Sequence, residues 1–209
     1  MMNPIWLVLG AYVLGSVPFG LLVGKWKGVN IREHGSGNIG ATNVGRVLGR
    51  KFGLGVFFLD FCKGLVAVTL VAGLAAVQAP ESMPWVRMAC LVGAVAGHNW
   101  SVFLGLKGGK GVATSAGGVL GLLPASALVG AVIFFVVVWW SGYVSLGSIL
   151  AAISVPIFLP LLVHPVPVAY WVLSILLAGV VIWRHRPNIQ RLRSGNESRV
   201  GWARKRRNQ

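Results

Sequence analysis

The sequence predicts an all-α, polytopic membrane protein with seven transmembrane helices, its N-terminus outside and its C-terminus in the cytoplasm. Composition is the first reason: of 209 residues, 56% are hydrophobic and only 11% are charged, which excludes an ordinary water-soluble domain. Charge is the second, because 19 Lys and Arg stand against 4 Asp and Glu, a formal net charge of +15. These basic residues flank apolar runs and do not cover a soluble face, so nucleic acid is not an expected partner.

Apolar runs long enough to cross a bilayer, about 20 residues each, recur along the chain. They lie near 4–24, 53–78, 86–104, 144–163 and 166–183, with an unbroken apolar stretch over 112–140. The first run has no basic residue before it and continues into a polar loop. It therefore predicts a retained helix and not a cleaved signal peptide.

The stretch over 112–140 decides the topology. As a single helix, it would place the loop with Lys107 and Lys110 and the arginine-rich tail on opposite faces of the membrane. Division at Pro124 brings every strongly basic segment to one face, so the positive-inside rule selects seven helices. We expect residues 1–209 to form one integral-membrane domain, with 194–209 as a basic cytoplasmic tail.

Polar or reactive residues inside the apolar runs are few. Cys62 and Cys90 are expected to be small buried residues, and the sequence names no metal site. Asp60 and Lys63 lie three residues apart in the second run, where charges need partners. They are predicted to form a mutual ion pair, with support of the first polar loop as the alternative.

The first polar loop, Gly35 to Arg46, combines glycines with hydroxyl, amide and guanidinium groups. Glycine permits positive φ and exposes backbone N–H groups, so such a loop can wrap an anion. A flexible linker is the alternative, but a linker has no use for these side chains. The candidate substrate-binding residues of the loop are Ser36, Gly37, Asn38, Gly40, Thr42, Asn43 and Arg46.

A second polar segment contains Gly97-His98-Asn99 and then Lys-Gly-Gly-Lys-Gly at 107–111. Ammonium groups beside bare backbone, just before a helix, favour phosphate. The glycine spacing is not that of a P-loop. Positive-inside anchoring is the alternative for the lysines, and a helix-end histidine for His98. The candidates are His98, Lys107, Gly108, Gly109 and Lys110.

Two further segments lie near the ends of later helices. Ser145 and Ser148 are three apart and share a helix face, although serines are also common packing residues between membrane helices. His185 and Asn188 have the same spacing where the last span ends. The flanking arginines are expected to keep His185 neutral. By the predicted topology, all four polar segments reach the cytoplasmic ends of the helices.

These motifs resemble those of the bacterial acyl-phosphate:glycerol-3-phosphate acyltransferases of the PlsY type. The similarity extends over nearly the whole chain and is carried by 35–44, 97–98 with 107–114, 143–149 and 184–189. It implies a seven-helix protein of the bacterial cytoplasmic membrane that performs the first acylation of phospholipid synthesis. A fatty acyl group would pass from acyl phosphate to glycerol 3-phosphate, giving lysophosphatidate and inorganic phosphate.

The resemblance also implies residue roles. The acyl phosphate would be held by Ser36, the amides near Gly37 to Gly40, Arg46 and Lys110, with help from Ser145 and Ser148. His185 and Asn188 would orient glycerol 3-phosphate. The expected catalytic residues are His185, Asn188, Ser148 and Lys110. No cofactor and no acyl-enzyme are expected, and either His185 or the substrate phosphate is the base. The remaining expected partners are membrane lipids and, transiently, the soluble enzyme that makes acyl phosphate.

The sequence departs from the family pattern at two positions, and two other functions remain as alternatives. Gly142 stands where relatives often carry a basic residue, and Ser101 where they often carry proline. A transporter of an organic phosphate would also show polytopic helices and a basic loop, but mid-membrane polar groups and an internal repeat are expected of it. A structural lipid-binding protein would need the basic residues alone.

Overall fold

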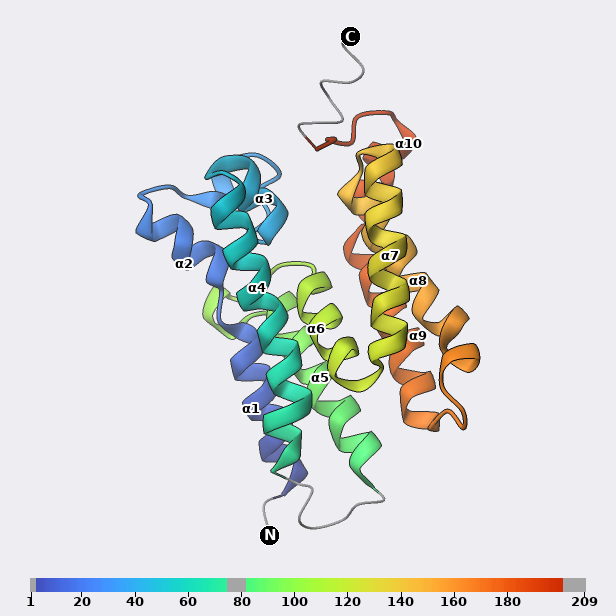
Figure 1. Ribbon diagram of the computed structural model, residues 1–209. Coiled ribbons are helices and arrows are strands. Elements are labelled where there is room, and N and C mark those ends of the chain that lie inside the picture. Colours follow the sequence, from blue (N-terminus) through green and yellow to red (C-terminus); the bar gives the residue numbers. More distant parts are fainter. Residues whose placement is uncertain (1–2, 75–81, 201–209) are drawn as a thin grey trace. The chain divides into compact units, whose positions relative to one another are not determined.

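The computed structural model describes residues 3–74 and 82–200, and all regular elements in these ranges are helical (Figure 1). The chain divides into two compact units, unit 1 (residues 1–122) and unit 2 (residues 123–209). The predicted single domain is not tested by this division. The Arg204 to Arg207 part of the predicted tail lies outside the described residues.

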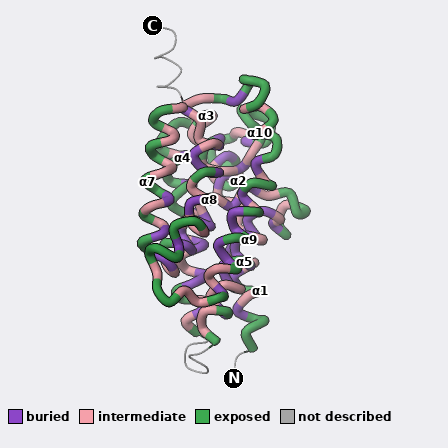
Figure 2. The backbone as a smooth tube through the Cα atoms, turned by 90° about the vertical axis from the view of Figure 1, so that its right-hand side faces the viewer, coloured by how far each residue is buried: buried purple, intermediate pink, exposed green. Residues whose placement is uncertain are grey.

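Unit 1 is built from long helices joined by two polar loops. Its elements are α1 (Pro4–Ser16), α2 (Phe19–Trp26), η1 (Ile31–Glu33), α3 (Ala41–Val47), α4 (Arg50–Val66), the π-helical η2 (Ala67–Val71), α5 (Met83–Asn99), η4 (Val102–Leu104) and α6 (Val112–Leu122). Helix α1 packs on α5, and α4 packs on α6 and α3. The buried positions gather along these helix contacts (Figure 2).

The first apolar run forms two helices, where the sequence predicted one. Helix α1 ends at Ser16 and α2 begins at Phe19. Pro18 has no N–H and disfavours helical geometry in the residue before it, and Val17 takes φ −58° and ψ 116°. The break leaves carbonyl groups at the end of α1 that other parts of the chain must satisfy.

Glycine permits close helix contacts in unit 1. A Cβ built on Gly15 of α1 would lie 2.0 Å from Ala94 O of α5, and one built on Gly64 of α4 would lie 1.8 Å from Thr114 O of α6. No larger residue fits at either position. Small residues at crossings are typical of membrane helices, where close backbone approach supplies the packing.

Unit 2 contains the predicted division at Pro124. Its helices are α7 (Pro124–Ser141), α8 (Val144–Leu162), α9 (Val168–Arg184) and α10 (Arg186–Arg193). Helix α6 of unit 1 ends at Leu122, and Pro124 occupies the first turn of α7, so the apolar stretch is two helices as predicted. The helix α10 was missed, because the last predicted span ended near residue 183 and no helix was predicted after it.

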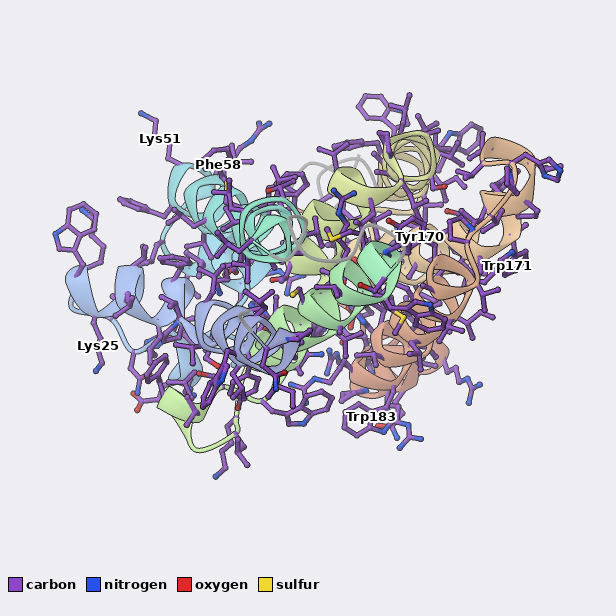
Figure 3. The ribbon with its side chains drawn as sticks, turned by 90° about the horizontal axis from the view of Figure 1, so that it is seen from below. Lys25, Lys51, Phe58, Tyr170, Trp171 and Trp183 are labelled. Atoms are coloured by element: carbon purple, nitrogen blue, oxygen red, sulfur yellow. The ribbon has the colours of Figure 1, made fainter. Side chains whose placement is uncertain are left out.

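Four helical stretches of the described residues are long and apolar enough to cross a membrane. They are Pro4–Trp26 (α1 with α2), Arg50–Val71 (α4 with η2), Pro124–Ser141 and Val144–Leu162, with α9 and α10, bent by 58°, as a fifth if the pair is one span. Large apolar side chains point outward from them, as Phe58 does on the helix that also carries the outward Lys51 (Figure 3). Exposed tryptophans near helix ends, such as Trp26 and Trp140, are typical of membrane interfaces. The chain is thus a multi-pass membrane protein.

Candidate active site

The first polar loop of unit 1 is organised by one buried side chain, that of Asn43. Its Oδ1 accepts a hydrogen bond from Ser36 N at 2.8 Å, and its Nδ2 donates to Ile31 O at 3.1 Å and His34 O at 3.0 Å. Asn43 is only 1% exposed, and such a buried amide needs these partners. Both amide hydrogens of this predicted substrate-binding residue are therefore committed to the loop itself.

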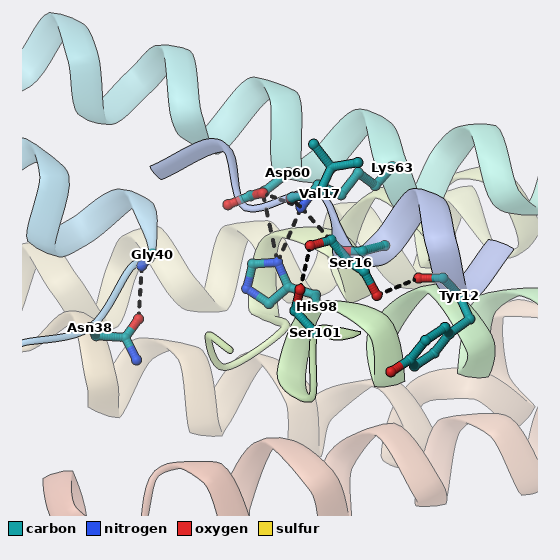
Figure 4. A network of polar contacts seen from close by, with 10 residues as sticks. Tyr12, Ser16, Val17, Asn38, Gly40, Asp60, Lys63, His98 and Ser101 are labelled. Carbon is teal, nitrogen blue, oxygen red and sulfur yellow. Dashed lines mark hydrogen bonds and ion pairs between the residues drawn. The ribbon is translucent and has the colours of Figure 1, made fainter. Parts of the chain in front are cut away.

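The backbone amides of Gly37 and Gly40 are engaged as well, which corrects the expectation that these two glycines expose them to an anion. Gly37 N donates to the carbonyl three residues before it at 3.1 Å. Gly40 N donates to Asn38 Oδ1 at 2.8 Å (Figure 4). Short polar loops close on themselves in this way, because side-chain oxygens imitate turn carbonyls. Gly37, with φ 68°, serves the turn conformation.

Three candidate side chains of the first loop remain at its surface. Ser36, Thr42 and Arg46 are all exposed. Thr42 and Arg46 are four residues apart in α3 and share one helix face. The loop thus presents two hydroxyls and one cation, while the chain that carries them is held by internal hydrogen bonds.

The second polar loop folds back on the end of α5. Gly108 N donates to Asn99 O at 3.1 Å, and Gly109 N donates to His98 O at 2.9 Å. These bonds use the last carbonyls of α5, which have no acceptor role inside their own helix. The glycine turn is therefore fixed to the helix that carries His98.

The two lysines of this loop differ in their surroundings. Lys107 is exposed, and its carbonyl accepts a hydrogen bond from Arg32 Nη2 at 2.9 Å. Lys110 is half-buried. Helix α6 begins at Val112, so Lys110 directly precedes a helix with one glycine between, as the sequence predicted.

The predicted pair of Asp60 and Lys63 is present and includes a third residue. Lys63 Nζ lies 2.7 Å from Asp60 Oδ1, and His98 Nδ1 lies 3.6 Å from the same oxygen (Figure 4). All three residues are buried. His98 thus belongs to a buried group of ionisable residues, and its predicted contact with substrate stays a prediction.

The polar region of unit 2 is organised by a carboxylate. Glu197 Oε1 accepts hydrogen bonds from Ser145 Oγ at 2.7 Å and Asn188 Nδ2 at 2.6 Å, and Glu197 Oε2 accepts one from Arg191 Nε at 2.8 Å. Two predicted site residues, from α8 and α10, therefore share one oxygen. We call these four residues the Glu197 cluster.

Glu197 was missed in the sequence, where it was not among the candidate site residues. The available signal was its rarity, as one of four acidic residues, nine positions after Asn188 in a basic segment. Burial raises the pKa of its carboxyl. The hydrogen bonds from Ser145, Asn188 and Arg191, with the charge of Arg191, outweigh this effect and lower the pKa below its ordinary value.

His185 lies at the bend between α9 and α10 and is only 3% exposed. Its Nδ1 lies 2.7 Å from Val181 O. A carbonyl can only accept, so Nδ1 carries the hydrogen, and Nε2 is the acceptor when the ring is neutral. Both neighbouring arginines lie against the Trp183 ring, with guanidinium carbons 5.8 and 5.9 Å from its centre. Their effect on the charge of His185 stays a prediction.

The two departures from the family pattern each have a structural counterpart. Gly142 ends α7 with φ 77°, a conformation that glycine adopts without strain. The guanidinium of Arg199 lies 4.7 Å from the ring of the adjacent Tyr143, which brings a positive charge to this segment. Ser101 is buried and donates from Oγ to Ser16 O at 2.6 Å, a bond that proline cannot make.

Residues 194–200 of the predicted tail pack back on unit 2. Besides the contacts of Glu197, Val200 N donates to Gly142 O at 2.9 Å.

Ser148, a predicted catalytic residue, is buried on α8 and donates from Oγ to Val144 O at 2.9 Å. Its catalytic role stays a prediction.

The fold and these polar regions define a polytopic helical membrane protein with cation-bearing glycine loops. Residues 5–195 match the family described as glycerol-3-phosphate acyltransferase. The chain is 44% identical over 198 residues to a glycerol-3-phosphate acyltransferase of Aquifex aeolicus, covering 95% of this chain and 100% of the relative. It is 47% identical over 199 residues to one of Geotalea daltonii, covering 95% and 98%.

Solved structures agree with these relatives. A crystal structure of PlsY (YgiH), an integral membrane glycerol 3-phosphate acyltransferase, in its glycerol 3-phosphate form has a TM-score of 0.86 and 44% identity, covering 95% of this chain and 96% of that one. The lysophosphatidic acid form has a TM-score of 0.83 at 43% identity, covering 95% of each chain. The chain therefore belongs to the glycerol-3-phosphate acyltransferase family of the PlsY type.

Proposed function

We propose that this protein transfers a fatty acyl group from acyl phosphate to the 1-hydroxyl of glycerol 3-phosphate, giving lysophosphatidate and inorganic phosphate. The observation that carries the proposal is family membership over residues 5–195. Two glycine loops that bear Arg46, Lys107 and Lys110 add chemical support, because both substrates carry phosphate. The enzyme would act at the cytoplasmic face of a bacterial inner membrane, with seven spans and an external N-terminus.

In this reaction the carbon–oxygen bond between acyl carbon and phosphate breaks, and an ester bond to the glycerol oxygen forms. An acyl phosphate is a mixed anhydride whose phosphate leaves readily. The enzyme needs placement of two anions more than a strong acid. In unit 1, Ser36, Arg46 and Lys110 would contact the acyl phosphate.

In unit 2, Asn188 and His185 would orient glycerol 3-phosphate, with help from Ser145 and Ser148 in holding the acyl phosphate. The proton of the attacking hydroxyl passes either to His185 Nε2 or to the phosphate of the substrate. We favour the phosphate, because it is a negatively charged oxygen already next to the reacting carbonyl. The buried Nε2 acceptor of His185 then aligns the hydroxyl.

The proposal is tested with purified protein in detergent or lipid, given acyl phosphate and labelled glycerol 3-phosphate. Labelled lysophosphatidate is the expected product. Acyl-CoA and acyl carrier protein thioesters, tried in parallel, identify the donor. Absence of product from acyl phosphate, or transfer from a thioester alone, would overturn the assignment.

Arg46→Ala and Lys110→Ala test the two cations in the same assay. Each should lose most of the turnover, by about a hundredfold, while the protein stays folded and inserted. Unchanged turnover would remove that residue from the phosphate site. An acylated protein trapped with acyl phosphate alone and released by hydroxylamine would contradict direct transfer.

A further inference from the structure

The strongest feature that the proposed reaction does not use is a buried group of ionisable residues in unit 1, which we call the Asp60 cluster (Asp60, Lys63 and His98). Asp60 and Lys63 are each 2% exposed, and His98 is 6% exposed. His98 Nδ1 lies 3.5 Å from Lys63 Nζ and 3.6 Å from Asp60 Oδ1. Burying charge inside a membrane span is costly, so the ion pair of Asp60 and Lys63, with His98 against it, calls for a role.

Lys63 connects this cluster to the break in the first apolar run. Its Nζ donates to Gly15 O at 3.2 Å and to Val17 O at 2.5 Å (Figure 4). Both carbonyls lie where α1 stops before Pro18. An ion pair that only set the depth of α4 in the membrane would require no contact of Lys63 beyond Asp60. The Lys63 ammonium also binds two carbonyls at the end of α1.

His98, the ionisable neighbour of the Asp60–Lys63 pair, connects the cluster to the glycine turn of the second loop. Its Nδ1 faces Asp60, and a Cβ built on Gly109 would lie 2.2 Å from its Nε2. The ring therefore packs directly on the Gly109 backbone. Gly109 N also donates to His98 O. A shift of His98 must move Gly109, and Lys110 is the next residue.

We propose that Lys63 is a positioning residue for acyl transfer, acting through Asp60 and His98 on the turn that presents Lys110. This inference rests on the proposed function for its catalytic consequence. The structural link from Lys63 to Gly109 stands on the distances above. Displacement of a reacting group by about 1 Å can cost about a hundredfold in rate, so a buried network distant from substrate can still set turnover.

The test uses the charge-balanced double variant Asp60→Asn with Lys63→Met. Lys63→Met alone would strand a buried carboxylate, which is strongly destabilising. The double variant removes both charges and keeps their volume. Asp60→Asn by itself, in which Lys63 keeps its two carbonyl partners, is a second variant for the same comparison. Lys51→Met, on the exposed start of α4, is the matched control.

Two measurements decide the inference. The turnover per folded molecule should fall by about tenfold or more in the double variant, with kcat affected more than KM and Lys51→Met at the wild-type rate. Hydrogen exchange of the amides over 105–111 should become about tenfold faster, while a peptide from α8 is unchanged. A purely structural ion pair predicts wild-type turnover once charge balance restores folding.

The outcomes separate this inference from the proposed function. Wild-type exchange over 105–111 in both the double variant and Asp60→Asn would overturn the positioning role, whatever the activity. Faster exchange with unchanged turnover would overturn its catalytic part. If the wild-type protein forms no lysophosphatidate, the proposed function fails, and the exchange measurement still decides whether Lys63 holds the turn.

Discussion

The first glycine loop of unit 1 and the Glu197 cluster of unit 2 hold predicted site residues by different means. In the loop, a neutral amide, Asn43, ties the backbone together and leaves Ser36 and Arg46 at the surface. In the cluster, an ionised carboxylate binds the predicted site side chains themselves. The first arrangement holds the backbone that carries the predicted substrate-binding side chains. The second holds such side chains directly. We therefore expect a substitution in the Glu197 cluster to lower kcat more than a substitution in the first loop does.

Among the changes that test this comparison, the largest effect is expected from Glu197→Gln. The new amide would face Arg191 Nε with a donor, and the charge-assisted bonds to Ser145 and Asn188 would be weakened. Hydrogen bonds to charged groups contribute about 1.5–3 kcal/mol, so kcat should fall by about tenfold to a hundredfold in the lysophosphatidate assay.

Glu33→Gln is the control, because Glu33 is exposed and accepts a hydrogen bond from Asn30 on the surface of unit 1. It should keep wild-type kcat. Full activity in Glu197→Gln would show that the cluster stabilises unit 2 without serving the reaction.

A smaller effect, on substrate affinity, is expected from Asn43→Ala. The change leaves Ser36 N and two carbonyls without their partner, each at a cost of about 1–3 kcal/mol. The loop should loosen, and KM for acyl phosphate should rise by about tenfold, with kcat less affected. Asn196→Ala, an exposed asparagine in unit 2, should change neither constant. A fall in kcat at constant KM would erase the distinction between the two regions.

The two regions should also respond differently to a fall in pH. The pKa of Glu197 is lowered in the fold, so its ionised form stabilises the protein fully above the unfolded value of about 4.3. That stabilisation is lost as pH falls through the folded pKa. The thermal midpoint of the wild type should drop more between pH 6 and about pH 3 than that of Glu197→Gln. Parallel curves would contradict a lowered pKa.

The smallest effect is expected from Ser101→Ala. Its hydroxyl donates to the carbonyl of Ser16 at the end of α1, and the loss of such a bond destabilises by about 1 kcal/mol. The thermal midpoint should fall by a few degrees while kcat is kept. Thr69→Ala, which removes an exposed hydrogen bond within one helix, should have less effect. A large loss of activity in Ser101→Ala would place the α1 break closer to catalysis than either region suggests.

The sequence predicted much of this fold because helix-forming apolar runs and proline breaks are local signals. The division at Pro124 is confirmed, and so is the ion pair of Asp60 and Lys63. The break at Pro18 is just as local, but it was missed because a run long enough to cross a membrane was interpreted as one helix. Seven spans and the orientation stay predictions.

The candidate site was less predictable, because side-chain partners are set by folding. Nothing in the position of Asn43 in the sequence indicates that its side-chain amide would accept a hydrogen bond from Ser36 N. Nothing local indicates that Glu197 would bind Ser145, which lies fifty-two residues before it. Motifs named residue types suited to phosphate, but not which of them shape the chain and which present contacts. The catalytic and substrate-binding roles stay predictions.

Under the proposed function, the internal closure of the first loop has a consequence for inhibitors. Since the amides of Ser36, Gly37 and Gly40 already donate within the protein, a phosphate mimic cannot draw on these three donors. It would have to engage the hydroxyls and the cation that the loop presents. Selectivity would then depend on the spacing of those side chains, which the loop holds without help from the bound molecule.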